Sequence, residues 1–289
     1  MRRMMLLGAL LVTGAVGIFA GQATQTQPNT TEIEKVRDNL FMIKGGGGNT
    51  AAFITAGGVV LVDTKYPNWG QAIMDKVRSV TDKPITTIIN THTHGDHTGS
   101  NDFFPASIEV VAHENTKTNM VKMKEFQGEK AQFLPDRTYA DRLTLLAGQD
   151  RIDLYYFGAG HTNGDTIVVY AALRVLQTGD LFAWKDAPFL DRGNGVSGVE
   201  LPRTLAKALA GIKDVDTVIP GHHPVTTIAD LQEYQRYNAD LLTETQAAIK
   251  AGKSVDDATA SSTVTAKYKG YKSERLKAAI QAIYDELKR

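Results

Sequence analysis

Four side chains of the types that bind metal ions lie within residues 91–97: His92, His94, Asp96 and His97. His92 and His94 are two positions apart, so on an extended segment their side chains point to the same side. Neutral imidazole and carboxylate are common nitrogen and oxygen ligands of zinc. Because a β-branched run leads directly into this group, the sequence predicts a metal centre where a buried strand meets a loop.

Three more candidate ligands, His161, Asp180 and His222, follow glycines farther along the chain. The chain has no cysteine, so its ligands must be His, Asp or Glu, which favours zinc or another borderline or hard divalent ion. A closed structural zinc site needs four ligands, whereas these candidates suffice for two ions with positions left for water. Two-metal hydrolytic sites place the ions roughly 3.5–4 Å apart around a reactive oxygen. We therefore expect two Zn²⁺ per chain.

The order His92-x-His94-x-Asp96-His97, followed by His161, Asp180 and His222, resembles the metallo-β-lactamase-fold hydrolase superfamily. The resemblance covers nearly all of the chain after the leader and implies an α/β fold, the four-layer αββα sandwich. It implies the following ligands: His92, His94 and His161 for the first ion; Asp96, His97 and His222 for the second; Asp180 as a bridge. Asp63, which ends a strand, resembles the family's buried carboxylate that braces the histidine loop.

The resemblance and the chemistry of two cations together imply hydrolysis. A water held between two cations loses a proton near neutral pH, and the metal-bridging hydroxide attacks the carbonyl of a small substrate. Asp96 is expected to orient the hydroxide and later to carry its proton. The expected substrate contains an amide or lactone ring, with β-lactams among the candidates.

Two positions distinguish this chain from a large subclass of β-lactamases in the superfamily. That subclass has Cys at the position of Asp180 and, three residues later, a Lys that binds the substrate carboxylate, where this chain has Ala183. Lys185 is either a replacement for that Lys or a solvated loop residue. Residues 182–198, with Phe189 among them, are either the wall of the substrate pocket or a surface loop over the core. No individual residue is assigned to substrate binding.

Three alternative functions stay open. A thioester hydrolase resembling glyoxalase II would use a similar ligand set. A mononuclear iron persulfide dioxygenase would use His92, His161 and Asp180, and would hold one iron per chain. A non-catalytic binding protein could retain the fold, but the complete ligand set argues against it.

Other residues near the motifs have structural interpretations. We expect His113 to be structural and Asp165 at most to brace the His161 loop. Because only one of two adjacent imidazoles normally points into a site, His223 is expected to turn away from it. The four glycines within residues 44–49 predict a mobile hairpin tip, which is either a permissive turn or a flap over the site.

Short buried strands and amphipathic helices must position these residues. Strands are expected at 40–43, 51–55, 59–63, 85–90, 110–111, 152–157, 166–170, 175–178 and 217–220. Helices are expected at 71–80, 114–124, 201–212 and from 228 to the end, with interruptions near Gly252 and Gly270. Residues 127–150 show no clean period and are left unassigned. This alternation predicts a layered core with functional residues on loops at one edge of the sheets.

The first 23 residues resemble a secretory signal peptide, with Arg2 and Arg3 before the apolar residues 4–20. An uncleaved membrane anchor is the alternative, but this run is at the lower limit for a spanning helix. We expect a periplasmic or secreted protein with residues 24–289 as its hydrolase domain. The 32 basic and 32 acidic residues balance, and no basic stripe indicates nucleic acid. The expected partner is a small-molecule substrate, without membrane contact after cleavage and without an inferred protein partner.

Overall fold

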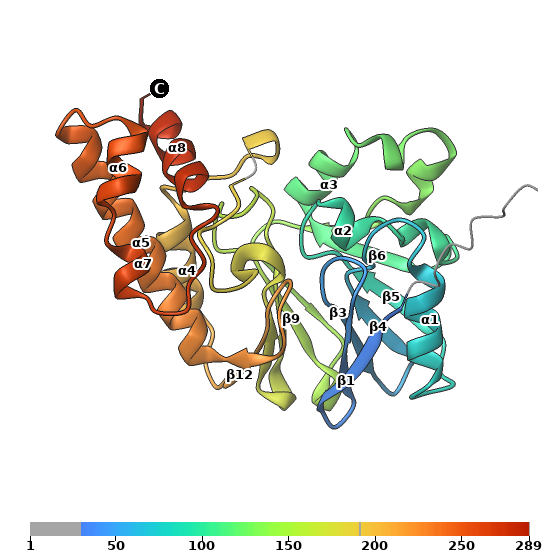
Figure 1. Ribbon diagram of the computed structural model, residues 1–289. Helices are drawn as coiled ribbons and strands as arrows, with labels where there is room; N and C mark the ends of the chain where they lie inside the picture. The colour runs from blue at the N-terminus through green and yellow to red at the C-terminus, as the bar shows by residue number, and fades with distance from the viewer. Residues whose placement is uncertain (1–29, 191, 289) are drawn as a thin grey trace, which may run out of the picture.

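Two mixed β-sheets form the centre of the molecule in a computed structural model that describes residues 30–190 and 192–288 (Figure 1). Sheet A has its strands in chain order: β1 (Glu32–Arg37), β2 (Leu40–Lys44), β3 (Thr50–Ile54), β4 (Val59–Val62), β5 (Ile85–Ile89), β6 (Glu109–His113) and β7 (Arg137–Tyr139). Neighbours from β1 to β4 pair antiparallel. Neighbours from β4 to β7 pair parallel, because longer connections join them.

Sheet B has the spatial order β13-β12-β11-β10-β9-β8. Its strands are β8 (Arg142–Leu145), β9 (Ile152–Tyr155), β10 (Ile167–Tyr170), β11 (Val175–Gln177), β12 (Thr217–Ile219) and β13 (Thr226–Thr227). β11 and β12 are parallel, and the other neighbours in this sheet are antiparallel. Both strands of this parallel pair lead into turns that carry predicted metal ligands, Asp180 and His222.

Helices cover the outer faces of both sheets. The α-helices are α1 (Gly70–Arg78), α2 (Gly95–Thr98), α3 (Glu114–Met120), α4 (Leu201–Gly211), α5 (Ile228–Lys250), α6 (Val255–Ser261), α7 (Val264–Lys267) and α8 (Leu276–Leu287). Short 3-10 turns are η1 (Asn101–Phe103), η2 (Lys124–Phe126), η3 (Gly128–Phe133), η4 (Gly148–Asp150), η5 (Ala171–Leu173), η6 (Gly179–Phe182) and η7 (Arg192–Asn194). Figure 1 shows α1 outside sheet A, and α4 to α8 on the opposite side of the molecule.

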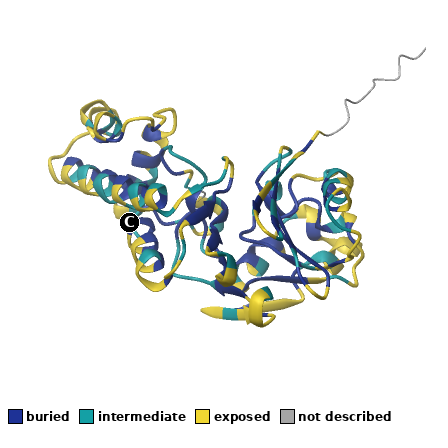
Figure 2. Cartoon of the chain, turned by 90° about the horizontal axis from the view of Figure 1, so that it is seen from below, coloured by how far each residue is buried: buried dark blue, intermediate teal, exposed yellow. Residues whose placement is uncertain are grey.

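The sheets pack face to face around a shared apolar cluster, in which Phe53 of β3 meets the Tyr170 ring of β10 edge-on at 5.2 Å. Alternate side chains of a strand point to opposite faces, so each sheet needs cover on its outer face. Ile73 and Val77 of α1 cover sheet A, whereas α4, α5 and α8 cover sheet B. Figure 2 shows the buried residues between these outer layers. The predicted four-layer αββα sandwich is confirmed.

Local sequence explains how the covering helices are built. Leu201, Leu205 and Ala208 of α4 recur every three or four residues and are buried, as on one face of a helix. Thr227 and Asp230 form a capping box at the start of α5, which satisfies backbone N–H groups of its first turn. α4 and α5 therefore present apolar faces that bury the outer side of sheet B.

The ligand-bearing loops meet at one edge of the sheets. β4 and β5 are parallel neighbours, so Asp63 and Thr91, which follow them, emerge at the same edge. β11 and β12 are also parallel, and they lead to Asp180 and His222. The loop after β9 adds His161. Strand ends of this kind are where open α/β sheets commonly place their functional residues.

The predicted strands and helices from 40 to 220 are present, with altered ends, and several elements were not predicted, among them β1, α2, β7, β8 and β13. β1 was missed because its residues are mostly charged and it lies at the edge of sheet A, where burial leaves little apolar pattern. The unassigned residues 127–150 contain η3, η4, β7 and β8. The helix expected at 114–124 ends earlier, at Met120.

The predicted leader, residues 1–23, lies outside the described residues. Within the described ranges, no helix combines the length and apolar character needed to cross a membrane. The helical stretch predicted from residue 228 is divided into α5, α6, α7 and α8; two of the three breaks contain the predicted glycines, Gly252 and Gly270, and the break between α6 and α7 was not predicted. Both of these glycines have positive φ, the backbone conformation that commonly ends a helix.

Candidate metal centre

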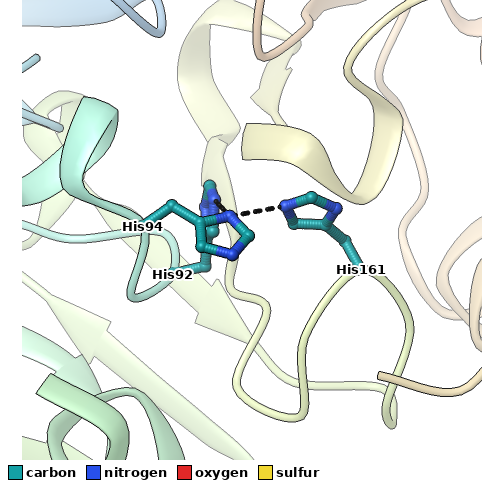
Figure 3. Close-up of side chains that lie close together, drawn as sticks. All are labelled: His92, His94 and His161. Atoms are coloured by element: carbon teal, nitrogen blue, oxygen red, sulfur yellow. Dashed lines mark hydrogen bonds between the residues drawn. The ribbon is translucent and has the colours of Figure 1, made fainter. Parts of the chain in front are cut away.

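Three histidine nitrogens converge at this edge of the sheets (Figure 3). His94 Nδ1 lies 3.1 Å from His92 Nε2 and 2.9 Å from His161 Nε2. His92 and His94 lie on the loop after β5, and His161 lies on the loop after β9. The three ring planes cross at 83–87°, so the rings are not stacked and their nitrogen atoms meet instead.

The chemistry of this trio fits a divalent cation. Zn–N bonds of about 2.0–2.1 Å in a tetrahedral site place two ligand nitrogens roughly 3.3 Å apart, which is near the separations found here. Burial lowers the pKa of His92 well below its ordinary value and lowers the pKa of His161 to about 4. Both imidazoles are therefore neutral at physiological pH and have a lone pair to donate.

A second group of ligand atoms lies beside the first. His97 Nε2 is 3.4 Å from His222 Nε2, and Asp96 Oδ2 is 3.2 Å from His222 Nε2 and 3.7 Å from His97 Nε2. Burial lowers the pKa of His97, but the charges of Asp180 and Asp63 outweigh it and hold the pKa well above the usual range. Hydrogen bonds to Asp180 and Asp96 likewise outweigh burial and raise the pKa of His222 to about 9. These imidazoles compensate the carboxylates with protons, which a second cation would displace.

Asp180 contacts both groups. Its Oδ1 lies 3.3 Å from His97 Nε2, whereas its Oδ2 lies 3.1 Å from His222 Nε2 and 3.7 Å from His161 Nε2. Oδ1 is buried, and His97 Nε2, which faces it at 3.3 Å, does not reach full hydrogen-bond geometry. A buried carboxylate oxygen without a well-aligned donor is costly, and a cation at this position would satisfy it. Gly221 permits the close approach, because a Cβ there would overlap Oδ1.

Partners on the outer nitrogens orient the imidazoles. Asp63, after β4, accepts hydrogen bonds from the Thr91 backbone N–H and hydroxyl, both at 2.8 Å, and lies 2.7 Å from His97 Nδ1. His161 Nδ1 lies 2.9 Å from the backbone oxygen of Phe189, so it donates there and leaves Nε2 to face the centre. Such contacts fix the tautomer and increase the basicity of the ligand nitrogen.

The glycine loop, residues 44–49, joins the antiparallel strands β2 and β3, so it is the predicted hairpin tip, and this tip packs against the centre. The Gly48 N–H donates to the backbone oxygen of Asp96 at 3.0 Å. Gly48 also faces the His97 imidazole so closely that a Cβ would overlap the ring. The loop is therefore a wall of the site, and its glycines allow the backbone to approach a ligand side chain.

Two polar side chains that the sequence analysis did not single out fasten the glycine loop. Lys65 is fully buried, and its Nζ donates to the backbone oxygens of Ile43 and Gly48, both at 2.8 Å. Burial lowers the pKa of Lys65 to about 7. Asn49 Nδ2 donates at 2.8 Å to the backbone of the turn that precedes His222. Nothing in the local sequence separates these contacts from those of ordinary surface residues.

A cleft of about 630 Å³ opens beside the centre. Part of its wall comes from residues 182–198, which the sequence suggested, with Trp184 and Phe189 facing the cleft. Lys185 instead forms ion pairs with Asp230 at 2.7 Å and Glu233 at 3.2 Å. Further lining residues that the sequence analysis did not identify are Tyr66, Lys272 and Arg275.

The three residues given structural interpretations lie outside the ligand groups. His113 stacks on Tyr156 at 4.0 Å, and its Nε2 lies 2.7 Å from a backbone oxygen. Asp165 accepts hydrogen bonds from Thr162 and so braces the turn after His161. His223 belongs to none of the candidate ligand groups, but it does line the cleft, where its ring stacks on that of Trp184.

The chain is similar to proteins with established names. The sequence model of the Metallo-beta-lactamase superfamily matches residues 43–224. Metallo-beta-lactamase type 2 from Elizabethkingia meningoseptica is 25% identical over 256 residues, which cover 78% of this chain and 95% of that protein. The alpha subunit of 2,4-dinitroanisole O-demethylase from Nocardioides sp. (strain JS1661) is 31% identical over 158 residues, 53% of this chain and 47% of that protein.

A solved structure supports the fold assignment. The crystal structure of DIM-1 metallo-beta-lactamase has a TM-score of 0.62 and 23% sequence identity, and the match covers 72% of this chain and 97% of that one. At 23% sequence identity, this structural similarity supports the fold alone. Because the family match spans more than half of the sequence, the chain belongs to the Metallo-beta-lactamase superfamily of metal-dependent hydrolases.

Proposed function

We propose that this chain is an exported hydrolase that uses two divalent ions, zinc foremost, to open an amide or lactone ring in a small substrate. The observation that carries the proposal is the convergence of two ligand groups that share contacts with Asp180. In this proposal the first ion is held by His92, His94 and His161, and the second by Asp96, His97 and His222. Asp180 reaches both, and Asp63 holds the loop that presents the histidines.

The residues around the centre have distinct roles in the proposed reaction. Bound cations would lower the pKa of a water between them and polarise the substrate carbonyl. Asp96 lines the cleft, where its carboxylate can accept a hydrogen bond from the attacking water and take its proton. The Trp184 and Phe189 rings give the substrate an apolar surface beside the ligands.

The size of the cleft supports a small substrate. Its volume of about 630 Å³ lies within the usual range of roughly 300–1,000 Å³ for small-molecule sites. One relative is named a metallo-beta-lactamase and another a subunit of an O-demethylase, so the substrate panel must extend beyond β-lactams. A cyclic amide or lactone is the class we infer, and a thioester is included because a related ligand set can hydrolyse it.

Elemental analysis and a substrate panel test the proposal together. The protein is purified without added metal, its metal content per chain is measured, and it is assayed with a chromogenic β-lactam, a γ-lactone and a glutathione thioester. We expect about two zinc ions per chain and ring opening that His94→Ala and Asp180→Ala reduce by orders of magnitude. His113→Gln, which removes a histidine outside the centre, should keep both metals. One iron per chain without hydrolysis would overturn the proposal in favour of a dioxygenase.

The role of Asp96 has its own test. Asp96→Asn keeps the size of the side chain and an oxygen ligand, but removes the negative charge that accepts a proton. We expect this variant to lose at least about 100-fold in kcat, which is the usual contribution of a general base. If turnover is unchanged while both metals are retained, the proton role is wrong.

Export is the part of the proposal that rests on the sequence of the leader. Arg2 and Arg3, followed by the apolar residues 4–20, are the pattern of a cleaved signal. Cell fractionation and the intact mass of the mature protein test it. Removal of about 23 residues and recovery from the periplasm or medium would support export, whereas a full-length cytosolic protein would refute it.

A further inference from the structure

The cleft beside the metal centre is closed on one side by the C-terminal segment. The ligands His94, Asp96, His161, Asp180 and His222 line the cleft together with Tyr234, Lys272 and Arg275. The last three residues follow position 224, where the match to the family ends. This wall therefore lies outside the region that matches the family. Residues there can give this chain a substrate specificity that the family does not share.

Backbone contacts hold the two cationic residues in place. Lys272 forms a parallel β-bridge with Asp186, and its N–H donates to the backbone oxygen of Lys185 at 3.1 Å. Arg275 is the N-cap residue of α8, and its backbone oxygen accepts the N–H of the residue four positions later. The charged groups are thus presented by an anchored segment, which reduces the entropy lost when a ligand binds.

Phe189 connects the cationic wall to the histidines. The Arg275 guanidinium carbon lies 5.8 Å from the centre of the Phe189 ring. The other neighbours of this ring are metal ligands, with centroid distances of 6.1 Å to His94 and 5.9 Å to His161. The cationic wall and the first ligand group are therefore separated by little more than one aromatic side chain, which is a span that a small molecule can bridge.

The charges of this wall do not cancel. Lys272 has no carboxylate within ion-pair distance among the described residues, whereas Lys185 is neutralised by Asp230 and Glu233. Asp186 is the carboxylate nearest to Arg275, with Nε and Oδ2 3.9 Å apart, which is too long for a hydrogen bond. Among the residues that line the cleft, this wall contributes two cations, Lys272 and Arg275, and one carboxylate, Asp186, whereas Glu274 acts on Asp186 from outside the lining.

We propose that Lys272 and Arg275 form an anion subsite that binds a carboxylate of the substrate while the scissile carbonyl lies at the metal centre. The inference rests on the proposed function and narrows its substrate class to small anionic acyl compounds. A guanidinium and an ammonium that converge on one carboxylate provide charge-assisted hydrogen bonds. Because both side chains are solvent-exposed, the expected contribution is about threefold in binding for each cation, or roughly tenfold for the two together.

Matched substrates test the subsite in the zinc-loaded enzyme. The pairs are benzylpenicillin with its methyl ester, and a γ-butyrolactone carboxylate with its primary amide. We expect the charged member to have a kcat/KM at least tenfold higher, mainly through KM. Lys272→Gln with Arg275→Gln should remove this preference and leave the neutral member within about twofold. Lys277→Gln, a change of the same charge on α8 at an ion pair with Asp256, is the control.

Asp186→Asn should strengthen binding of the charged substrate, which is the opposite of the effect expected for the double substitution. Removing the carboxylate beside Arg275 increases the positive charge of the wall, so KM for the charged member should fall by about threefold or more. Equal kcat/KM for charged and neutral members in the unaltered enzyme would overturn the subsite. A preference for the charged member that survives the double substitution would overturn it as well.

Direct binding separates the subsite from the proposed reaction. Calorimetry on the zinc-loaded enzyme compares butyrate with the dicarboxylates succinate, glutarate and adipate. At least one dicarboxylate should bind about tenfold more tightly than butyrate, and Lys272→Gln with Arg275→Gln should abolish the difference. Equal affinities throughout the series would overturn the subsite. If no substrate is hydrolysed, the proposed function fails, and the binding series still decides the subsite.

Discussion

Replacing Gly48 with alanine tests whether the glycine loop sets the position of His97. An alanine Cβ at this position would lie 2.5 Å from His97 Nε2 and 2.6 Å from Nδ1, whereas ordinary contact begins near 3.4 Å. Because the Cβ would overlap Cε1 of the ring more closely still, the ring or the loop must move by more than about 0.9 Å. The ring is fully buried and its Nδ1 is held by Asp63 at 2.7 Å, so it cannot simply rotate away.

The expected effect follows from that displacement. A shift of about 1 Å in a catalytic constellation can cost roughly 100-fold in rate, which corresponds to about 2.7 kcal/mol of transition-state stabilisation. Overpacking adds about 1–3 kcal/mol of instability. We expect Gly48→Ala to bind its second zinc ion roughly 10–100-fold more weakly, to retain the first, and to lose about 100-fold in kcat/KM.

Zinc titration against a competing chelator, together with kcat/KM, measures this effect. Gly57→Ala is the matched control, because its Cβ would meet nothing within 4 Å and the residue lies in the turn between β3 and β4. Thermal unfolding of both variants checks that the fold is retained. If Gly48→Ala binds two zinc ions and turns over substrate like the unaltered enzyme, the glycine loop does not position His97 and the reasoning is wrong.

Three further predictions concern the stability of the fold. Lys65→Met removes the donor to two buried backbone oxygens but also removes the cost of burying the charge. The net effect should be a fall of about 2 kcal/mol in the free energy of unfolding, measured in urea. An unchanged free energy of unfolding would contradict this. Burial raises the pKa of Asp230, but Lys185 and two threonine hydroxyls outweigh it and lower the pKa to about 2. Because this lies below the ordinary value, the stabilisation is complete above about pH 4 and is lost as the pH falls towards 2. The stability difference between the metal-free protein and Asp230→Asn should therefore shrink across that window, and a constant difference would refute the assignment. Removing the metal with a chelator should abolish hydrolysis and lower Tm, and two equivalents of zinc should restore both. A Tm that does not respond to zinc would count against the proposed metal centre.

The sequence was sufficient to predict the fold and to nominate the ligands, because both leave local patterns. His92 and His94 stand at alternate positions after a β-branched run, and glycine precedes His161 and His222. Parallel pairing of β4 with β5 and of β11 with β12 then brings these loops to one edge. The periodicity of apolar residues was equally informative for α1 and α4, each of which buries one face.

Contacts that depend on packing between distant segments left no such pattern. The sequence suggests that Lys65 is a surface residue, but its own backbone has positive φ in the turn after β4 and its side chain is fully buried. Lys272 and Arg275 are 50 or more positions beyond His222, and they reach the cleft because the C-terminal helices fold back on sheet B. The glycine loop is the hairpin tip that the sequence predicted, but only the folded chain shows that this tip places Gly48 against His97.

A loaded centre would also cross-link the chain. His97 and His222 are 125 positions apart in sequence, and His94 and His161 are 67 apart, yet their facing nitrogens lie within 3.4 Å. The protein has no cysteine and therefore no disulfide to close such loops. By the chain-entropy argument used for disulfides, closing a loop of ~100 residues stabilises a fold by about 4–5 kcal/mol. The resistance of the folded protein to proteases would then depend on the supply of zinc, and reducing agents would not change it.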